Sequence, residues 1–477
     1  VFGGQGLGHL PNGQAVFVWN ALPGEEVEIE IIKKKKNYIE GVARNIITAS
    51  PDRVEPPEPN IFLSTSPWQM TNMETEQKYK KEIAAETYRK LGGLDIEADD
   101  LEILTDGKIY GYRNKMEFGF TDNEQLAISN ERSPVSLAFF TRGGKKKIAV
   151  DGSALAHPAI NDAAQYILNW INEQNIPLRS LKSLIVRCGS AQDQSTMTPL
   201  LLGAGARGEV QCGTKSAPTN TIAALFIKDK LTFNQYPALT NTLKGFHLFY
   251  STHKSPASVP TELLYSEGES TITETIIYPP LLLGAGARGE VRSETQYAPI
   301  NNTKLTYGLF SFFQINPPVF QLALADIKKF ITPELPVLDF YAGVGTIGLT
   351  ATHQRNNTIT LIEENAEAVS FAQKNIELNH RTDCSAICAP SEKMRDLIES
   401  NQVVILDPPR VGLHHKLTER LNEQKPRRII YLSCGIDTQA RDIALLSENY
   451  KVSFLKLYNF FPRTPHVEAL CVLDKKV

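Results

Sequence analysis

The feature that most constrains the fold is an alternation, from about residue 305 onward, of short apolar runs with helical segments. Such an alternation predicts an α/β domain whose strands form a doubly wound, parallel sheet with right-handed crossovers. Ligands of such sheets bind beyond the carboxyl ends of the strands. We predict strands at 336–340, 358–363, 402–406 and 428–432, a helix at 365–379 and a final hairpin.

Length and composition set the outer limits. A chain of 477 residues with 42% hydrophobic content buries a large core and divides into roughly two to four domains. It shows no apolar run of membrane-spanning length and no signal peptide, which predicts a cytoplasmic protein without membrane contact. Because the chain begins without Met, we expect a short N-terminal piece to be missing.

The cysteines and the net charge exclude further classes of protein. The six cysteines form no C-x-x-C pair, which fits a reducing compartment and predicts no metal site. A net charge of −3 argues against a polycationic nucleic-acid binder, so any RNA contact must be local.

Residues 1–55 form the first predicted domain. Short alternating runs separated by Gly and Pro-Gly turns predict a small antiparallel β-barrel. Its basic loop consists of Lys33, Lys34, Lys35 and Lys36. Phosphate contact and a solvated turn are equally good interpretations of such a run.

Residues 56–304 are predicted to form a central α+β domain, with a helix at 74–91 near its start. One twelve-residue segment, PLLLGAGARGEV, occurs at 199–210 and again at 280–291. Its flanks do not match, which favours elements inserted in two surface loops, at about 195–214 and 278–300, over a structural repeat. It also lacks the Gly-Lys-Ser/Thr ending of a phosphate-binding P-loop.

Residues 305–477 form the third predicted domain, and a Gly-x-Gly-x-x-Gly turn over 343–348 follows its first sheet strand. Glycines at such a turn let a ligand approach the backbone closely. Glu363 ends the next strand, where a carboxylate can accept hydrogen bonds from both ribose hydroxyls of a nucleoside cofactor. A nicotinamide enzyme would use the same device, so this pair alone leaves an oxidoreductase open.

Asp407-Pro408-Pro409-Arg410 follows another apolar run. Proline fixes its own φ and restricts the residue before it, so the Asp407 carboxylate is held rigidly at the strand end. This arrangement suits a flat, polar ring as ligand. The less favoured interpretation is that the two prolines only end the strand and have no role in function.

Cys434 and Glu468 supply a nucleophile and a base. Cys434 lies just beyond an apolar strand, at the predicted edge of Asp407, whereas the other five cysteines read as inert. Glu468 enters an apolar strand, where burial raises a carboxyl pKa toward the range of a general base. A loop staple in which Glu468 pairs with Arg463 or His466 is the structural alternative.

Taken together, these motifs resemble those of the RNA (uracil-C5-)-methyltransferases, which use S-adenosylmethionine. Residues 1–55 resemble the family's OB-like TRAM domain, Tyr112–Glu117 a signature of its central domain, and Phe312–Asn316 the entry to its Rossmann-like catalytic domain. The resemblance implies a monomer that acts on tRNA or 23S rRNA. It implies cofactor contacts by Gln314, Tyr341, Gly343, Gly345, Thr346, Glu363 and Asp407, and substrate contacts by Asp407, Arg410 and Lys33–Lys36.

The resemblance also implies the catalytic roles. The C5 of uracil is a weak nucleophile until a thiolate adds at C6, and this is the task expected of Cys434. Glu468 then removes the C5 proton so that the thiolate can leave. Arg410 balances anionic charge on either the enolate or a phosphate.

Three departures from the family's pattern matter. No cysteine occurs over 60–69, where many members bind an iron-sulfur cluster, so we expect no cluster. Thr346 replaces an asparagine of several relatives, and Asn459 replaces a frequent acid. Two rival functions remain: a catalytically silent RNA-binding homologue and, less favoured, a nicotinamide-dependent oxidoreductase.

Overall fold

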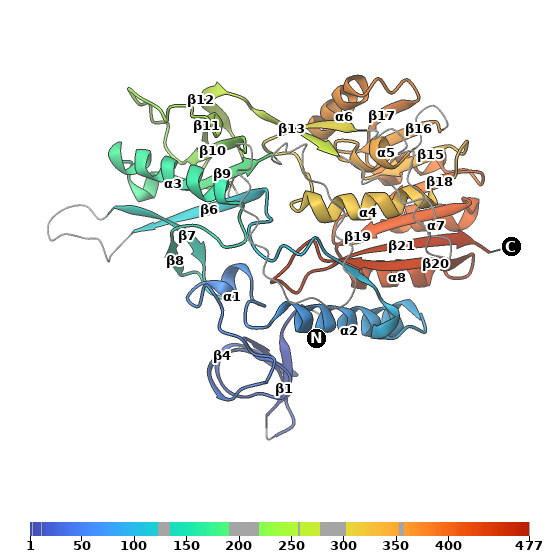
Figure 1. The fold of residues 1–477 in the computed structure, drawn as a ribbon, viewed down its shortest axis with the longest axis horizontal. Helices are drawn as coiled ribbons and strands as arrows, with labels where there is room; N and C mark the ends of the chain where they lie inside the picture. Colours follow the sequence, from blue (N-terminus) through green and yellow to red (C-terminus); the bar gives the residue numbers. More distant parts are fainter. Residues whose placement is uncertain are drawn as a thin grey trace, which may run out of the picture.

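The computed structural model describes residues 1, 3–10, 12–122, 134–189, 219–255, 258–276, 302–352 and 357–476. Both copies of the twelve-residue segment, the two insertion loops proposed around them and Cys212 lie outside these residues. Figure 1 shows three bodies, with the N-terminal strands below, one sheet at the left and a larger sheet at the right.

The N-terminal sheet has the strand order β1-β2-β4-β3. Its strands are β1 (Gly6–His9), β2 (Ala15–Trp19), β3 (Glu26–Lys34) and β4 (Tyr38–Thr48). Alternate residues such as Val16, Val18 and Ile39 fill its small core, as the period of a half-buried strand requires. The expected all-antiparallel pairing is wrong at one place, because β2 and β4 run parallel. The crossover through β3 that permits this pairing is a long-range choice, which local alternation does not encode.

Among the described residues, the central sheet has seven strands in the order β12-β11-β10-β9-β6-β7-β8, in which β10 and β11 are parallel and the other neighbouring strands are antiparallel. Helix α3 (Pro158–Glu173) packs its apolar face on this sheet. The strands are β6 (Lys115–Asp122), β7 (Val135–Phe140), β8 (Lys147–Val150), β9 (Leu181–Cys188), β10 (Thr221–Ile227), β11 (Leu243–Tyr250) and β12 (Glu262–Gly268).

The C-terminal sheet has eight strands in the order β17-β16-β15-β18-β19-β21-β20-β5. Its middle strands are buried along their length and, apart from Asp339, apolar, as expected of parallel strands covered on both faces. The strands are β15 (Val337–Phe340), β16 (Ile359–Glu363), β17 (Cys384–Cys388), β18 (Val403–Leu406), β19 (Arg428–Ser433), β20 (Tyr450–Tyr458) and β21 (Glu468–Lys475). The sheet is mixed rather than wholly parallel, because β21 pairs antiparallel with both β19 and β20.

Helices cover both faces of this sheet. Helices α4 (Pro317–Phe330), α5 (Thr346–Ala351) and α6 (Ala366–Leu378) contribute to one core cluster. Helices α7 (His415–Gln424) and α8 (Ile436–Leu446) contribute to the other. This is the doubly wound α/β arrangement expected from the alternation of strands and helices.

Two elements that precede the C-terminal third of the chain also join its sheet. The side chains of Ala84, Ala85 and Tyr88 on helix α2 (Met73–Gly92) lie in the same core cluster as α7 and α8. Strand β5 (Ile103–Leu104) pairs with β20 as the eighth strand (Figure 1). The domain limits 1–55, 56–304 and 305–477 stay predictions, but the stretch around 73–104 packs with the third unit.

The remaining elements connect these bodies. Strand β13 (Thr271–Ile276) pairs with β14 (Thr303–Gly308) in a two-stranded sheet. Helix α1 (Phe62–Thr65) precedes α2, and short 3-10 turns occupy Ala98–Asp100, Leu178–Ser180, Ser391–Lys393 and Arg395–Leu397. Among the residues described, no helix is both long and apolar enough to cross a membrane.

Candidate active site

One edge of the C-terminal sheet gathers the functional side chains. In spatial order, β16 ends at Glu363, β15 carries Asp339, β18 is followed by Asp407 and β19 by Cys434. Because β21 runs antiparallel, its first residue, Glu468, reaches the same edge. Each neighbouring strand adds about 4.8 Å, so the five strand ends span roughly 19 Å.

Cys434 and Glu468 are brought together by strand register. Ser433 is the pairing partner of Ala469, and one step further along both strands lie Cys434 and Glu468. The next residue after Cys434 is Gly435, and helix α8 begins at Ile436. The two predicted catalytic residues therefore occupy neighbouring strand ends, although they are 34 positions apart in the sequence.

A buried glutamine fastens these two strands together. Gln439, on α8, donates one hydrogen bond from Nε2 to the carbonyl of Tyr431 at 2.8 Å and another to the carbonyl of Ala469 at 3.1 Å. Its Oε1 accepts a hydrogen bond from the hydroxyl of Tyr88 on α2. The spacing of Cys434 and Glu468 is thus set by a side chain that sequence reasoning missed.

Glu468 is almost completely buried, with 3% of its surface exposed. Its Oε2 has no hydrogen-bond partner. Burial and, second, the charge of Asp407 raise the pKa of Glu468 well above its usual value, whereas the charge of Arg410 lowers it. The loop staple considered for this residue is not formed: Arg463 instead donates to the carbonyl of Thr71 and lies 3.7 Å from Glu76.

The Cys434 thiol has a pKa raised to about 11. Burial is the main cause, followed by the charges of Glu468 and Asp407. Arg410 opposes these effects through its charge and a hydrogen bond. One guanidinium therefore favours the anionic form of both Cys434 and Glu468.

The cofactor side of the edge holds three carboxyl groups. Asp339 is fully buried, and its pKa is raised to about 8 by burial and by the charges of Asp407 and Glu363. Its Oδ2 accepts from the amide of Gly348 at 2.8 Å, while its Oδ1 has no partner. Burial raises the pKa of Asp407 to about 7.

These groups fit S-adenosylmethionine. A ligand that carries a sulfonium and an ammonium would offset the mutual repulsion of Asp339, Asp407 and Glu363. Glu363 is already oriented at the glycine-rich turn, where its Oε2 accepts from the amide of Gly343 at 3.0 Å. A Cβ added to Gly343, which has φ +57°, would meet nothing within 4 Å, so the turn is open to a ligand.

The other cofactor residues expected from the resemblance flank this site. Thr346 is buried and begins α5 directly after Gly345, which has φ +85°. Tyr341 directly follows β15 with φ +62°. Gln314 is buried in the loop before α4, where its carbonyl accepts a hydrogen bond from Asn114 of the central body at 3.0 Å.

Sequence reasoning also passed over Asp339, although it precedes the glycine-rich turn by only four residues. The available signal was an acid inside a four-residue apolar strand, where a carboxylate is costly unless it has a task. Gln439 gave no such signal, because a glutamine on an amphipathic helix is ordinary.

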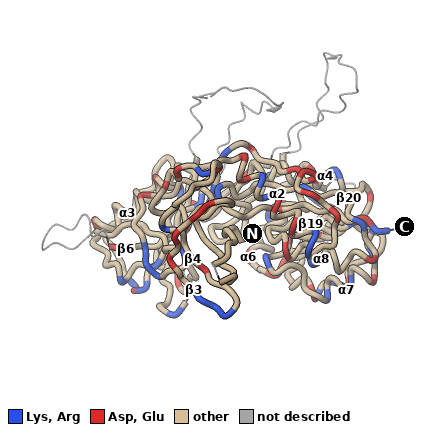
Figure 2. Tube along the Cα trace, turned by 90° about the horizontal axis from the view of Figure 1, so that it is seen from below, with Lys and Arg blue, Asp and Glu red and all other residues tan. Residues whose placement is uncertain are grey.

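Several positive charges act on His466, two residues before Glu468. The charge of Arg410, and those of Lys80, Arg113 and Arg142, help burial to lower the pKa of His466 to about 4. His466 is therefore neutral at physiological pH and accepts or donates without adding charge. The basic run Lys33–Lys36 lies elsewhere, at the β3–β4 hairpin (Figure 2), where Lys33 pairs with Glu40 at 2.7 Å.

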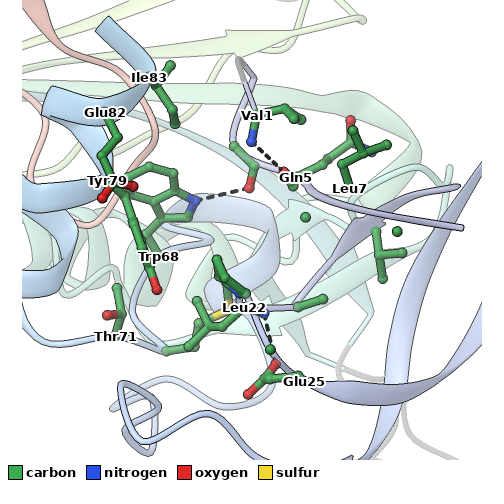
Figure 3. A pocket seen from close by; sticks show the side chains of 18 of the residues that line it. Val1, Gln5, Leu7, Leu22, Glu25, Trp68, Thr71, Tyr79, Glu82 and Ile83 are labelled. Carbon is green, nitrogen blue, oxygen red and sulfur yellow. Dashed lines mark hydrogen bonds between the residues drawn. The ribbon is translucent and has the colours of Figure 1, made fainter. Parts of the chain in front are cut away.

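A cavity of about 340 Å³ lies at a different place, between the N-terminal strands and α2 (Figure 3). Trp68 and Tyr79 line it, together with Glu25, Glu82 and Glu86. Its acidic lining is the wrong sign for RNA phosphates, and none of the strand-end residues takes part. We therefore place the candidate site at the sheet edge and not in this cavity.

Comparison with known proteins agrees with this assignment. A family model described as tRNA (Uracil-5-)-methyltransferase matches residues 296–476, and a TRAM domain model matches residues 2–43. Residues 296–476 are therefore identified as a (uracil-5-)-methyltransferase domain. The matches confirm the predicted enzyme class and the N-terminal TRAM domain, and the relatives are named as RNA methyltransferases.

Relatives and a solved structure cover almost all of the methyltransferase. An uncharacterized RNA methyltransferase of Fusobacterium nucleatum is 27% identical over 495 residues, covering 100% of this chain and 94% of its own length. One of Clostridium tetani is 28% identical over 490 residues, covering 99% and 95%. The crystal structure of Pyrococcus abyssi tRNA (uracil-54, C5)-methyltransferase with S-adenosyl-L-homocysteine has a TM-score of 0.68 at 21% identity and covers 98% and 100%, which supports the fold.

Proposed function

We propose that this methyltransferase modifies C5 of a specific uridine in tRNA or 23S rRNA, with Cys434 as nucleophile and Glu468 as general base. The observation that carries the proposal is a buried carboxyl with a free oxygen at the strand end next to the thiol. A buried carboxyl oxygen without a hydrogen-bond partner costs stability, so a catalytic task explains it.

S-adenosylmethionine, when bound, supplies an electrophilic methyl group. We assign its binding to the glycine-rich turn at Gly343, Gly345 and Thr346 and to the three carboxyl groups of Asp339, Glu363 and Asp407. Tyr341 and Gln314 border the same place. The charge of Asp407 raises the pKa of the Cys434 thiol, so the two groups are near each other, and we assign the Asp407 carboxylate to accept from the N3–H of a uracil ring.

The chain's own residues carry the remaining steps. The Cys434 thiolate adds to C6 of uracil, and the electron pair of the C5–C6 double bond makes C5 nucleophilic. Once C5 carries the methyl group, the Glu468 carboxylate takes the C5 proton. The C5–C6 double bond reforms, and the sulfur leaves as a thiolate.

Arg410 tunes both reacting groups. In the free enzyme the raised pKa values favour the protonated forms of Cys434 and Glu468. Both roles need the anionic form, and the guanidinium of Arg410 favours it in each case. Because the charge of Arg410 acts on both Cys434 and Glu468, we assign it to the anionic charge that develops on the uracil O4 after thiolate addition rather than to a phosphate.

The target RNA is the open part of the proposal. The matching family model is named for tRNA, and the Pyrococcus abyssi neighbour is a tRNA (uracil-54, C5)-methyltransferase. Both observations support testing tRNA first, with 23S rRNA as the second candidate.

The first experiment is transfer of labelled methyl groups to unmodified tRNA and to 23S rRNA fragments, with the product mapped by nuclease digestion and mass spectrometry. We expect 5-methyluridine at one position of one RNA. Cofactor binding without methylation of either RNA would contradict the proposal and favour a silent RNA-binding homologue.

A pair of variants separates the two catalytic roles. Cys434→Ala should form no covalent adduct with RNA, because no thiolate can add to C6. Glu468→Gln should accumulate the adduct, because the C5 proton is not removed. Denaturing gels of each variant with labelled RNA measure this, and turnover by either variant would refute the assigned roles.

A further inference from the structure

Gln439, on helix α8, is a polar side chain in an apolar core. None of its surface is exposed, and the core cluster on this face of the sheet consists of apolar residues from α2, α7, α8 and the strands. Burying an amide in such surroundings costs free energy unless hydrogen bonds to the protein replace those to water. The reaction steps assigned above do not use this residue.

The amide of Gln439 has one favourable orientation. Its two Nε2 protons are donated to the carbonyls of Tyr431 and Ala469, and its Oε1 accepts from the hydroxyl of Tyr88. Half a turn of the amide would place Oε1 against two carbonyl oxygens, which accept and cannot donate. Tyr88 therefore locks the side chain from helix α2.

The locked amide holds the chain beside both reacting groups. Ala469, on β21, directly follows Glu468. Tyr431, on β19, lies three residues before Cys434. The register of β19 with β21 ends at the pair formed by Ala469, one step before the reacting residues. Gln439 thus joins the two strands close to the point where their pairing ends.

The close packing of α2 against α8 makes Tyr88 part of the site (Figure 1). A Cβ added to Gly92 of α2 would lie 3.5 Å from the carbonyl oxygen of Ala440. Burial, followed by the charges of Cys471 and Glu468, raises the pKa of Tyr88 well above its usual value. The hydroxyl that locks the amide is therefore within electrostatic reach of Glu468.

We propose that Gln439 is a positioning residue, which keeps Glu468 within reach of C5 while the base is bound to Cys434. Tyr88 holds it in that role. The inference rests on the proposed function, because only that reaction has a C5 proton to remove. Removal of the proton re-forms the C5–C6 double bond and releases the sulfur as a thiolate. A displacement of Glu468 by about 1 Å slows that step by up to about a hundredfold, so the covalent adduct persists.

The first test replaces Gln439 by Met, which keeps the length of the side chain and removes its hydrogen bonds. In single-turnover reactions with S-adenosylmethionine and the RNA that the wild type methylates, Gln439→Met should release 5-methyluridine about tenfold more slowly. The share of protein in the covalent adduct should rise on denaturing gels. The KM for RNA and the affinity for S-adenosylhomocysteine should stay the same, because no contact with either ligand is removed.

A double variant separates positioning from stability. Gln439→Met alone leaves the buried hydroxyl of Tyr88 without its acceptor, which lowers stability, whereas replacing both partners by apolar groups of similar shape is close to neutral. Tyr88→Phe combined with Gln439→Met should therefore unfold in urea near the wild-type midpoint and still release product about tenfold more slowly. Tyr88→Phe alone, which frees the amide to turn, should slow release about threefold.

Gln402→Met is the matched control. Gln402 is also buried, at 7% exposure, accepts from the amide of Glu399 at 2.9 Å and donates to the carbonyl of Leu397 at 3.2 Å. It lies directly before β18, at the end of that strand opposite to Asp407. Its substitution should lower stability, while product release and the level of adduct stay at their wild-type values.

Alkylation of Cys434 by iodoacetamide gives a second readout that needs no RNA. Burial is the main cause of the raised pKa of this thiol, and the charge of Glu468 is the second. A displaced Glu468 and a looser core both lower that pKa. The pH of half-maximal alkylation, followed on the Cys434 peptide by mass spectrometry, should fall by about half a pH unit in Gln439→Met and not in Gln402→Met.

The two readouts separate this inference from the proposed function. If alkylation shifts as expected but the wild type methylates neither tRNA nor 23S rRNA, the proposed function fails and the spacing role of Gln439 stands. If the wild type methylates RNA, and Gln439→Met and the double variant keep wild-type release, adduct level and alkylation, the inference fails alone. Equal changes in Gln402→Met would also overturn it.

Discussion

Two groups of buried ionisable side chains lie close together in this methyltransferase. One group is fully paired, whereas the other has buried oxygens without hydrogen-bond partners. Where α2 meets the segment before β21, Lys80 and Glu76 are both without exposed side-chain surface and form an ion pair of 2.8 Å. Lys80 also donates to Asn459 at 2.7 Å. At the neighbouring strand ends, Asp339 and Glu468 each keep one buried oxygen without a partner.

This difference distinguishes buried polar groups that stabilise the fold from those that serve the site. A buried charge is tolerated when an opposite charge and hydrogen bonds replace its water, as they do for Lys80. A buried carboxyl group with too few hydrogen-bond partners lowers the stability of the fold. Binding of a ligand or a role in the reaction explains why such a group is present. Asn459, noted as a departure from a frequent acid, belongs to the paired group, because Glu76 already supplies the negative charge opposite Lys80.

The largest effect that would sharpen this contrast is expected from Glu468→Gln. Turnover should fall at least about a thousandfold, because an amide cannot take the C5 proton. Stability should nevertheless rise by about 1 kcal/mol or more at pH 8. A carboxyl with a raised pKa destabilises the fold increasingly as pH rises above its unfolded value, so the gain should shrink at pH 5. Urea unfolding at both pH values measures this, and a loss of stability at pH 8 would contradict the contrast.

Lys80→Met tests the paired group. The substitution removes the closer of the two cations beside Glu76 and leaves only Arg463, at 3.7 Å, so it should cost about 3 kcal/mol of unfolding free energy. Lys90→Ala is the control on the same helix, because Lys90 and Glu86 form an exposed ion pair whose loss should cost less than about 0.5 kcal/mol. Equal costs in denaturant titrations would show that burial of the pair is not what matters.

The pH dependence of cofactor binding tests the unpaired group. The pKa values of about 7 for Asp407 and about 8 for Asp339 are raised, and a cationic ligand favours the ionised forms. S-adenosylmethionine should therefore bind about three- to tenfold more tightly at pH 8 than at pH 6. S-adenosylhomocysteine, which lacks the sulfonium charge, should show a shallower trend, and Asp407→Asn should flatten both. Isothermal titration calorimetry measures all three, and affinity that is independent of pH would refute the argument.

The smallest effect concerns charges that are not buried at all. Replacing Lys34, Lys35 and Lys36 by Ala should weaken RNA binding about two- to fivefold at low salt and reduce the salt slope. Cofactor affinity and unfolding should not change. Anisotropy over a salt series measures this, and an unchanged slope would favour the solvated-turn interpretation of the run.

Much of the site's placement could be predicted from sequence. Glu363, Asp407 and Cys434 come at or just after apolar strands, and parallel strands bring their carboxyl ends to one edge, so local patterns suffice. The final hairpin delivers Glu468 to the same edge for a similar reason. The roles of these residues remain proposals.

The rest depends on contacts between distant segments. Strand β5 is only two residues long and joins the sheet through a partner more than 350 positions away. The parallel pairing of β2 with β4 and the bonds that Gln439 makes to two strands are also invisible to periodicity. Arg187 reads as a polar interruption of an apolar strand, and only the folded chain reveals the carbonyls that it binds.

The contacts between the three bodies also affect the intrinsic fluorescence of the protein. Of the three tryptophans, Trp19 lies under the guanidinium of Arg142, 4.1 Å from its ring centre, and so reports where the N-terminal strands meet the central body. Trp68 donates from Nε1 to the carbonyl of Gly4, and a Cβ on Gly4 would clash with Pro465, two residues before Val467 and three before Glu468. Trp170 lies within the central body alone. Intrinsic fluorescence therefore contains built-in signals for two of the seams, and Phe substitutions at Trp19 and Trp68 would assign each signal without any added label.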